Sequence, residues 1–378
     1  MELKASPPAM ELNAGRPAME LNAGRPAMEQ PGTIPALIVQ RVAAHGPETV
    51  LRKKDRGLWK AVTWAELDAR RRAIGLALRA VEFRQGDVAG ILSETTPDAV
   101  YADLGILSAG GVSLAVHPED EADQVRRILR ESACRVLFVE DEEQLDKALT
   151  VRDSCPALTR IVILDMKGLR DFGDPGCESF ETFAARGAGQ KDSNAGSIRA
   201  DHPAVMLFPR GTGASRLLTH GEVLAMVTAA HARLGANAGD ERLAVLPMSD
   251  PLERIHGLYL ALEAGVVSNY LESPETAREN LQEVKPTLFG ADAEAWTRLH
   301  ARISGGATGA TGLQRALYRW AIGAGRGNPL ANMLVLRAVR RELGMDRLRV
   351  AYVSGTKPSQ EVINWASALG ISIELVEI

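Results

Sequence analysis

Apolar side chains recur along this sequence with two different periods. From Thr63 to Val81 they return every three or four residues, with Leu67, Ile74 and Leu78 on one side of a predicted helix. Thr63 and a glutamate three residues later have the spacing of a capping box, which marks the start of that helix. Elsewhere the apolar residues form short unbroken runs that are typical of buried strands. These runs are 86–92, 112–116, 135–140, 160–165, 205–208, 242–246, 266–271, 286–290 and 349–354.

Predicted helices lie between most of these strands, and the alternation indicates the fold class. Apolar strands separated by amphipathic helices favour an α/β fold of largely parallel sheets flanked by helices. Because the crossovers of such sheets are right-handed, we expect loops such as 209–215 at the carboxyl ends of the strands. Ligands of parallel sheets usually bind at that edge, so a functional site is expected there.

The chain is predicted to divide into three parts. In residues 1–32 the motif PAMELNAGR occurs twice in tandem with a proline in each copy, so we expect a disordered tail, with a peptide ligand as the alternative. Residues 189–203 form the most polar stretch of the remainder and have no helical or strand period. We therefore expect one α/β subdomain over 33–190. A second, incomplete subdomain over 200–378 would carry the glycine-bearing turn.

Charge and cysteine content narrow the class of partner. The 378 residues contain 44 Lys and Arg against 48 Asp and Glu, a net charge of −4. This near balance gives no reason to expect nucleic acid or an anionic membrane as the partner. Three cysteines without a paired or metal-binding spacing favour a reducing, cytoplasmic setting. No apolar run reaches the ~18 residues of a membrane span, so we expect no integral membrane segment.

One turn has the composition of an anion-binding loop. The stretch VMLFPRGTGASRLLTHGE runs from an apolar strand through Gly211, Thr212 and Gly213 into a predicted helix. Small residues let a phosphate approach the backbone N–H groups at the start of a helix. Ser215 and Arg216 complete the candidate set; the stretch contains no Lys, and Arg216 is the cation nearest to the predicted helix. The open alternative is a tight turn that needs glycine only for its backbone angles.

Several longer stretches resemble the adenylate-forming family, and most closely its AMP-forming long-chain fatty acyl-CoA synthetases. The stretch 63–92 looks like the first βα unit of that family, and LTHGEVLA at 218–225 like the helix after its phosphate loop. The strand and helix of 244–265 resemble the family's next unit, and 272–303 resembles the stretch that leads to its acyl pocket. The resemblance spans roughly 33–378 and implies the large N-terminal part of such an enzyme, without its C-terminal domain.

The resemblance implies a reaction and its cofactors. The family uses ATP and Mg²⁺ to convert a carboxylic acid to an acyl-adenylate, and then transfers the acyl group to coenzyme A. A fatty acid or another carboxylic acid is therefore the implied substrate. The chemistry requires a cradle for the phosphates and a pocket that aligns the carboxylate with the α-phosphorus.

The phosphate loop of the family reads Tyr-(Thr/Ser)-Ser-Gly-Thr-Thr-Gly-x-Pro-Lys-Gly, and this chain follows it only in part. Phe208 stands at the aromatic position, and Gly211 and Thr212 match the central Gly-Thr, but the two hydroxyl residues and the Lys are missing. Near the end, Gly355 matches the family's adenine-binding Ser-Gly-Gly-Ala, whereas Thr356 departs from it. Arginine is no conservative replacement for a phosphate-binding Lys.

These departures leave two hypotheses about activity. The first is a fatty acyl-CoA synthetase homologue that is weakly active or inactive as this chain, which ends before the position of the family's Tyr-Gly-x-Thr-Glu motif. The second is a non-catalytic pseudo-ligase that binds an acyl chain, a nucleotide or a protein partner.

A few single residues have two interpretations each. Asp250 stands where acyl-CoA synthetases usually carry His, and we expect it to cap the following helix, although it could instead repel an acyl carboxylate. His220 and His256 are expected to be structural residues on helices. Trp320 and its apolar neighbours at helical spacing are expected in the core. The arginines of 336–349 indicate a solvated helix face, or a surface for an acidic partner.

Overall fold

The structure is a computed structural model that describes residues 31–190, 197–208, 215–306 and 311–377. Residues 31–378 form one compact unit by their internal contacts. The repeat tail, up to residue 30, and Gly211, Thr212 and Gly213 lie outside the described residues. The expected disorder of the tail and the expected cradle formed by these three residues therefore stay predictions.

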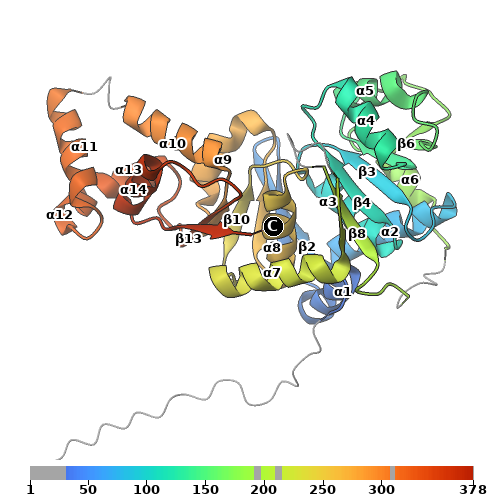
Figure 1. Cartoon of the computed structure of the whole chain (residues 1–378), viewed down its shortest axis with the longest axis horizontal. Helices are drawn as coiled ribbons and strands as arrows, with labels where there is room; N and C mark the ends of the chain where they lie inside the picture. Colours follow the sequence, from blue (N-terminus) through green and yellow to red (C-terminus); the bar gives the residue numbers. More distant parts are fainter. Residues whose placement is uncertain (1–30, 191–196, 209–214, 307–310, 378) are drawn as a thin grey trace, which may run out of the picture. The chain divides into compact units, whose positions relative to one another are not determined.

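Two seven-stranded sheets organise the described chain (Figure 1). The first has the strand order β7-β6-β5-β3-β4-β8-β9, and every neighbouring pair is parallel except β8 with β9. Its strands are β3 (Val88–Leu92), β4 (Val112–Val116), β5 (Val136–Val139), β6 (Arg160–Ile163), β7 (Cys177–Ser179), β8 (Pro203–Leu207) and β9 (Arg216–Thr219).

The second sheet has the order β14-β13-β12-β10-β11-β1-β2, with only β1 and β2 antiparallel. Its strands are β1 (Thr49–Asp55), β2 (Leu58–Thr63), β10 (Glu241–Ala244), β11 (Val267–Tyr270), β12 (Leu288–Gly290), β13 (Val350–Ser354) and β14 (Ile373–Val376). The α/β class with largely parallel sheets is confirmed. Each sheet also takes a hairpin from the other part of the sequence: β1 and β2 join the later strands, while β8 and β9 join the earlier ones. The division at 190–200 stays a prediction about folding units.

Helices connect and flank the strands. The α2 capping box is present as expected, because the Thr63 hydroxyl accepts from the Glu66 N–H and the Glu66 carboxylate accepts from the Thr63 N–H. The α-helices are α1 (Ile34–His45), α2 (Trp64–Ala80), α3 (Pro97–Ser108), α4 (Ala122–Glu131), α5 (Glu142–Arg152), α6 (Phe180–Ala185), α7 (His220–Leu234), α8 (Leu260–Ala264), α9 (Ala277–Val284), α10 (Ala293–Gly306), α11 (Gly312–Ala324), α12 (Pro329–Ala331), α13 (Arg337–Glu342) and α14 (Gln360–Ala368). Two π-helices, η1 (Leu252–Tyr259) and η3 (Asn332–Leu336), and one 3₁₀ helix, η2 (Pro274–Thr276), are the other helices of the described residues.

The π-helix η1 is buried along its whole length and holds the two sheets together. Its Arg254 is fully buried and forms an ion pair with Asp103 on α3, and the same guanidinium donates to Ser113 Oγ on β4 at 2.5 Å. The neighbouring Glu253 forms a second buried ion pair, at 2.5 Å, with Arg242 on β10 of the other sheet. Consecutive residues of one helix are therefore fixed to both sheets.

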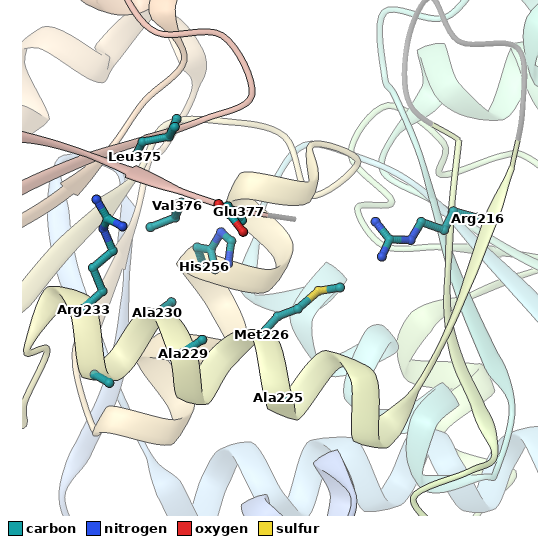
Figure 2. Close-up of a pocket in the computed structure, with 11 residues that line it drawn as sticks. Arg216, Ala225, Met226, Ala229, Ala230, Arg233, His256, Leu375, Val376 and Glu377 are labelled. Carbon is teal, nitrogen blue, oxygen red and sulfur yellow. The ribbon is translucent and has the colours of Figure 1, made fainter.

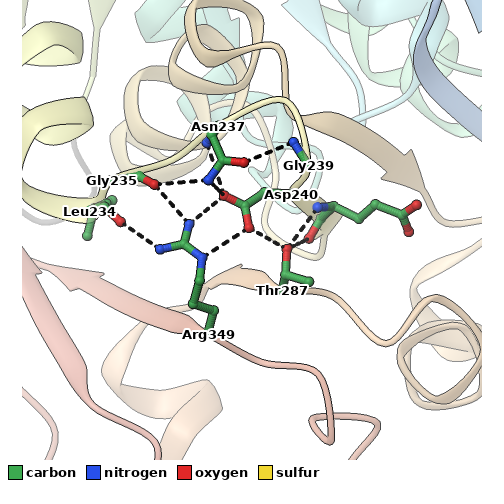
Figure 3. A network of polar contacts seen from close by, with 8 residues as sticks. Leu234, Gly235, Asn237, Gly239, Asp240, Thr287 and Arg349 are labelled. Atoms are coloured by element: carbon green, nitrogen blue, oxygen red, sulfur yellow. Dashed lines mark hydrogen bonds and ion pairs between the residues drawn. The ribbon is translucent and has the colours of Figure 1, made fainter. Parts of the chain in front are cut away.

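A polar network fixes the C-terminal end of α7 against the second sheet (Figure 3). Asp240 accepts hydrogen bonds from Thr287 Oγ1 at 2.7 Å and from the Arg349 guanidinium, which also donates to Gly235 O at 3.0 Å. Burial acts to raise the pKa of Asp240, but the Arg349 and Thr287 hydrogen bonds outweigh it and lower that pKa. These residues lie at the amino ends of β10, β12 and β13, opposite the edge where ligands are expected.

Two local expectations were wrong. The glycine-bearing stretch does not run directly into a helix, because β9 pairs antiparallel with β8 before α7 begins at His220. Leu317 and Trp320 of α11 are not core residues either, since they are 38% and 42% exposed. The helix that their spacing predicts is present, but the side of the helix that Leu317 and Trp320 share is exposed to solvent.

Candidate functional site

A cavity of about 770 Å³ lies between α7, η1 and β14 (Figure 2). Arg216 reaches it from β9, so the stretch after the candidate phosphate loop borders the cavity. The lining residues are Arg216, Ala225, Met226, Ala229, Ala230, Ala232, Arg233, His256, Leu375, Val376 and Glu377. Most of these are apolar, and the polar ones include two arginines, one glutamate and one histidine.

The space exists because α7 presents short side chains on the side that faces the cavity. Ala225, Ala229 and Ala232 follow one another at helical spacing, and Met226 is the one long apolar side chain that α7 adds to the lining. Because alanine side chains end at Cβ, the helix does not fill the gap to β14. The cavity is therefore suited to the flexible apolar part of a ligand.

His256 contributes an unpaired polar atom. Its side chain is 1% exposed, and Nδ1 has no hydrogen-bond partner among the described residues. Its backbone carbonyl accepts from Tyr352 Oη at 3.0 Å, which ties this part of η1 to β13. Burial lowers the pKa of His256 to about 4, so the ring is neutral at neutral pH. This nitrogen therefore has an unused hydrogen-bonding capacity in a residue that lines the cavity.

The other buried histidine on these helices differs in position. His220 begins α7, is fully buried, and Nδ1 accepts from the Ile34 N–H at 3.4 Å, while Nε2 has no partner among the described residues. It does not line the cavity. The expected structural role suits His220, whereas His256 lines the candidate site. In both rings at least one nitrogen has no hydrogen-bond partner among the described residues.

Charged groups stand at the rim of the cavity. Arg216 is exposed and has no ion pair within the described part of the chain. Arg233 is paired with Glu374 at 3.3 Å, so its charge is partly balanced. Among the described residues that line the cavity, Arg216 is therefore the cation that remains available to an anionic ligand group.

The structure brings only some of the expected site residues to the cavity. Ser215 and Arg216 follow the carboxyl end of β8, which is the expected edge of the sheet, and Arg216 alone lines the cavity. Gly355 and Thr356 are exposed directly after β13, at the carboxyl edge of the second sheet. They do not line the cavity, although the preceding residue, Ser354, pairs with Val376, which does. The binding roles of these residues stay predictions.

Asp250 behaves as a helix cap. Its Oδ1 accepts from the Leu252 N–H at 2.8 Å, and its carbonyl accepts from the Arg254 N–H at 3.0 Å. Burial raises the pKa of this carboxyl group. The capping interpretation is confirmed by these bonds, and Asp250 is not among the residues that line the cavity.

The neutral state of His256 predicts a pH dependence of stability. Its folded pKa of about 4 lies below the ordinary 6.5, so the unfolded chain binds the extra proton first as the pH falls. Stability is therefore fully present above about pH 6.5 and is lost toward about pH 4. Relative to His256→Gln, we expect the wild-type chain to lose about 2 kcal/mol of unfolding free energy between about pH 7.5 and about pH 4.5. Urea unfolding of both proteins at the two pH values measures this loss, and a constant difference would contradict it.

The residues near the cavity suit an acyl group better than they suit a triphosphate. The lining is largely apolar, Arg216 is an exposed cation, and no lysine is among the described residues of the lining. Among the described residues, no group of three or more His, Cys, Asp or Glu side chains is arranged to hold a metal ion. In the same part of the chain, no helix is long and apolar enough to cross a membrane.

The chain belongs to the family described as AMP-binding enzyme, which matches residues 39–378. Among its relatives, the long-chain-fatty-acid–CoA ligase ACSBG2 of Rattus norvegicus is 23% identical over 373 residues, covering 91% of this chain and 56% of the relative. The long-chain-fatty-acid–CoA ligase FadD15 of Mycobacterium tuberculosis is 24% identical over 310 residues, covering 78% of this chain and 50% of the relative. This chain thus spans about half the length of these relatives.

Solved structures share the fold. The A-PCP didomain of a carboxylic acid reductase from Segniliparus rugosus, in complex with AMP, matches with a TM-score of 0.75 and 18% identity, over 93% of this chain and 52% of that one. The anthranilate CoA ligase AuaEII, in complex with anthranoyl-AMP, matches with a TM-score of 0.68 and 16% identity, over 90% of this chain and 58% of that one. The resemblance to adenylate-forming enzymes is confirmed at the level of family and fold.

Proposed function

We propose that this chain binds the acyl part of a long-chain fatty acid, or of its acyl-adenylate, in the cavity between α7, η1 and β14. The observation that carries the proposal is an apolar cavity that has a free cation, Arg216, at its rim and an unpaired nitrogen, His256 Nδ1, in its wall. An apolar chain would occupy the space beside the alanines of α7. The carboxylate or phosphate end would lie toward Arg216.

The reaction proposed for the lineage is the ATP-dependent formation of an acyl-adenylate and its transfer to coenzyme A, with Mg²⁺ as the metal. Relatives named long-chain-fatty-acid–CoA ligases support this reaction class. In this chain, ATP would meet the loop that includes Gly211 and Thr212, where the family's lysine is absent. Since Arg216 is bulkier than lysine and delocalises its charge, we propose weak or no turnover by this chain.

A non-catalytic role is the second candidate, and the same departures of the phosphate loop favour it. A pseudo-ligase would retain the acyl cavity and bind a ligand or a protein partner without releasing pyrophosphate. The proposed cytoplasmic location rests on cysteines alone, since Cys134, Cys155 and Cys177 are all unpaired.

Filling the cavity tests the binding proposal. Met226→Trp adds volume to the wall that α7 provides, so we expect the affinity for palmitate, measured by isothermal titration, to fall at least about tenfold. Two methylenes kept out of the cavity would suffice for this loss, at ~0.8 kcal/mol each. Val39→Trp is the matched control, because Val39 is 56% exposed on α1 and does not line the cavity. Equal affinities of both variants would refute the proposed acyl site.

Pyrophosphate release separates the two functional candidates. We expect the chain to bind palmitate but to release no pyrophosphate above background with ATP, Mg²⁺ and coenzyme A. Turnover that an Arg216→Lys variant increases would instead favour an active ligase with an imperfect phosphate loop.

A further inference from the structure

The helical region 311–341 carries a local charge that the balance of the whole chain conceals. It contains no Asp, Glu or Lys, and it contains the six arginines Arg315, Arg319, Arg326, Arg337, Arg340 and Arg341. Within the described residues, none of the six has an ion pair. The side-chain bonds found there run from Arg326 to the Gly370 carbonyl at 3.2 Å and from Arg340 to Asn332 Oδ1 at 3.1 Å. Neither acceptor carries a neutralising charge.

The arginines also lie close enough to repel one another. Burial, and after it the charges of Arg326 and Arg337, lowers the pKa of Arg340. The Nε of Arg340 is buried and has no hydrogen-bond partner in the described part of the chain. The charge of Asp346 acts to raise the pKa of Arg340, but Asp346 is paired with Lys285 and forms no ion pair with Arg340, so the cluster is not neutralised within the described residues.

The same helices expose large apolar side chains. Of the nine exposed large apolar side chains among the described residues, six belong to this region. They are Leu313 (80% exposed), Leu317 (38%), Trp320 (42%), Leu330 (58%), Met333 (64%) and Leu334 (54%). Single exposed apolar residues are ordinary, but repeated ones on neighbouring helices mark an interaction surface.

On α11 the exposed apolar residues and the arginines occupy different sides of the helix, and both sides are in contact with solvent. At 100° per residue, Leu313, Leu317 and Trp320 form one stripe, and Arg315 and Arg319 occupy another sector. Ala321, which is fully buried, lies in neither sector. The helix therefore packs on the protein through its third side and presents both stripes outward.

The consecutive segments α12, η3 and α13 repeat this arrangement. Leu330 and Leu334 are exposed, and Arg337 and Arg341 follow at the spacing of successive helical turns. Of these segments, α12 and η3 pack against α11, as Figure 1 shows for α11 and α12. The helix α11 and the run from α12 to α13 thus each combine exposed leucines with arginines that have no ion pair among the described residues.

We propose that residues 311–341 form a docking surface for an anionic lipid bilayer. The six arginines, none of which has an ion pair among the described residues, complement a negative surface, and guanidinium groups bind lipid phosphates in bidentate fashion. The exposed leucines insert among the acyl chains, while Trp320 lies at the level of the headgroups. Nucleic acid would not require the apolar stripes. The surface is independent of the acyl cavity, so this proposal does not rest on the proposed function.

Vesicle binding tests the surface with the full chain. We expect the protein to co-sediment with phosphatidylcholine vesicles that contain about one third phosphatidylglycerol, and to bind pure phosphatidylcholine much more weakly. Arg315→Gln combined with Arg319→Gln should lower the partition coefficient about twentyfold. Arg84→Gln combined with Arg170→Gln is the matched control, because it removes two exposed arginines elsewhere that have no ion pair among the described residues. We expect this control to lose less than about threefold.

Two further measurements test the exposed apolar side chains. Leu330→Gln combined with Leu334→Gln should weaken vesicle binding at every salt concentration, while circular dichroism stays unchanged because both side chains are exposed. Trp320 should give a blue shift of tryptophan emission on anionic vesicles, and Trp320→Phe should abolish that shift.

Three results would overturn the proposal. The first is that the folded wild-type chain does not bind anionic vesicles. The second is that the double variant of Arg315 and Arg319 and the control double variant of Arg84 and Arg170 lose the same amount of binding. The third is a dimer in solution that Leu330→Gln with Leu334→Gln dissociates, without any vesicle binding by the wild-type chain. That result would assign the surface to a second copy of this chain.

Discussion

Replacing Asp103 by Ala should cost about 3–5 kcal/mol of unfolding free energy, because it leaves the buried Arg254 charge without its partner. Arg254 is fully buried, and Asp103 also accepts from Ser113 Oγ at 2.6 Å and from Tyr259 Oη at 2.8 Å. The substitution therefore leaves three buried donors with one acceptor fewer. Urea unfolding, followed by circular dichroism, measures the loss.

Two further variants separate the charge effect from a general effect of losing a carboxylate. Asp123→Ala removes an acid that is 84% exposed and paired with Arg126 at 2.7 Å, and it should change stability by less than about 1 kcal/mol. Asp103→Leu combined with Arg254→Met removes both charges and should be less damaging than Asp103→Ala alone. If Asp103→Ala unfolded at the same urea concentration as the wild-type chain, the ion pair would not hold η1 as described.

Replacing Gly344 by Ala should cost about 3 kcal/mol, for two separate reasons. Gly344 has φ +69°, a conformation that costs an L-residue ~1–2 kcal/mol. A Cβ there would also lie 2.3 Å from Leu281 O and 2.5 Å from Leu281 C, both of which belong to the backbone of α9. Backbone atoms in a packed helix cannot move aside cheaply, and overpacking of this kind costs ~1–3 kcal/mol.

Gly57→Ala is the matched control for this substitution. Gly57 has φ +76° in the turn between β1 and β2, and a Cβ there would meet nothing within 4 Å. We expect it to cost only the ~1–2 kcal/mol of the backbone conformation. The difference between the two variants in thermal or urea unfolding measures the clash with α9. Equal losses would mean that α9 moves aside freely.

Most of the strands could be predicted from the sequence because they are short apolar runs buried on both faces. The runs at 112–116 and 349–354, for example, correspond to β4 and β13. The hairpin of β1 and β2 was missed, since it is rich in charged residues and is stabilised by pairing with β11 rather than by its own pattern. The strand β9 was missed because it has only four residues, and its last residue, Thr219, belongs to the capping box that marks the start of α7.

The site was harder to predict than the fold. Sequence reasoning located the carboxyl edge of β8 and named Arg216, which does border the cavity. It assigned His256 a structural role, because a sequence does not reveal whether a ring nitrogen finds a partner. A signal was present in α7, where Ala225, Ala229 and Ala232 recur on one side and leave room beside the helix. The strand that closes the other wall, β14, has no pattern that connects it with α7.

The exchange of hairpins between the sheets affects how the chain is made. Leu51 of β1 pairs with Ser268 of β11, so the hairpin leaves the ribosome roughly 200 residues before its neighbour exists. At ~5–20 residues per second this wait lasts about 10–40 s. During translation the edge of β1 is thus an unsatisfied row of amides and carbonyls on a nascent chain, and a chaperone that shields this edge would protect the protein until β11 is synthesised.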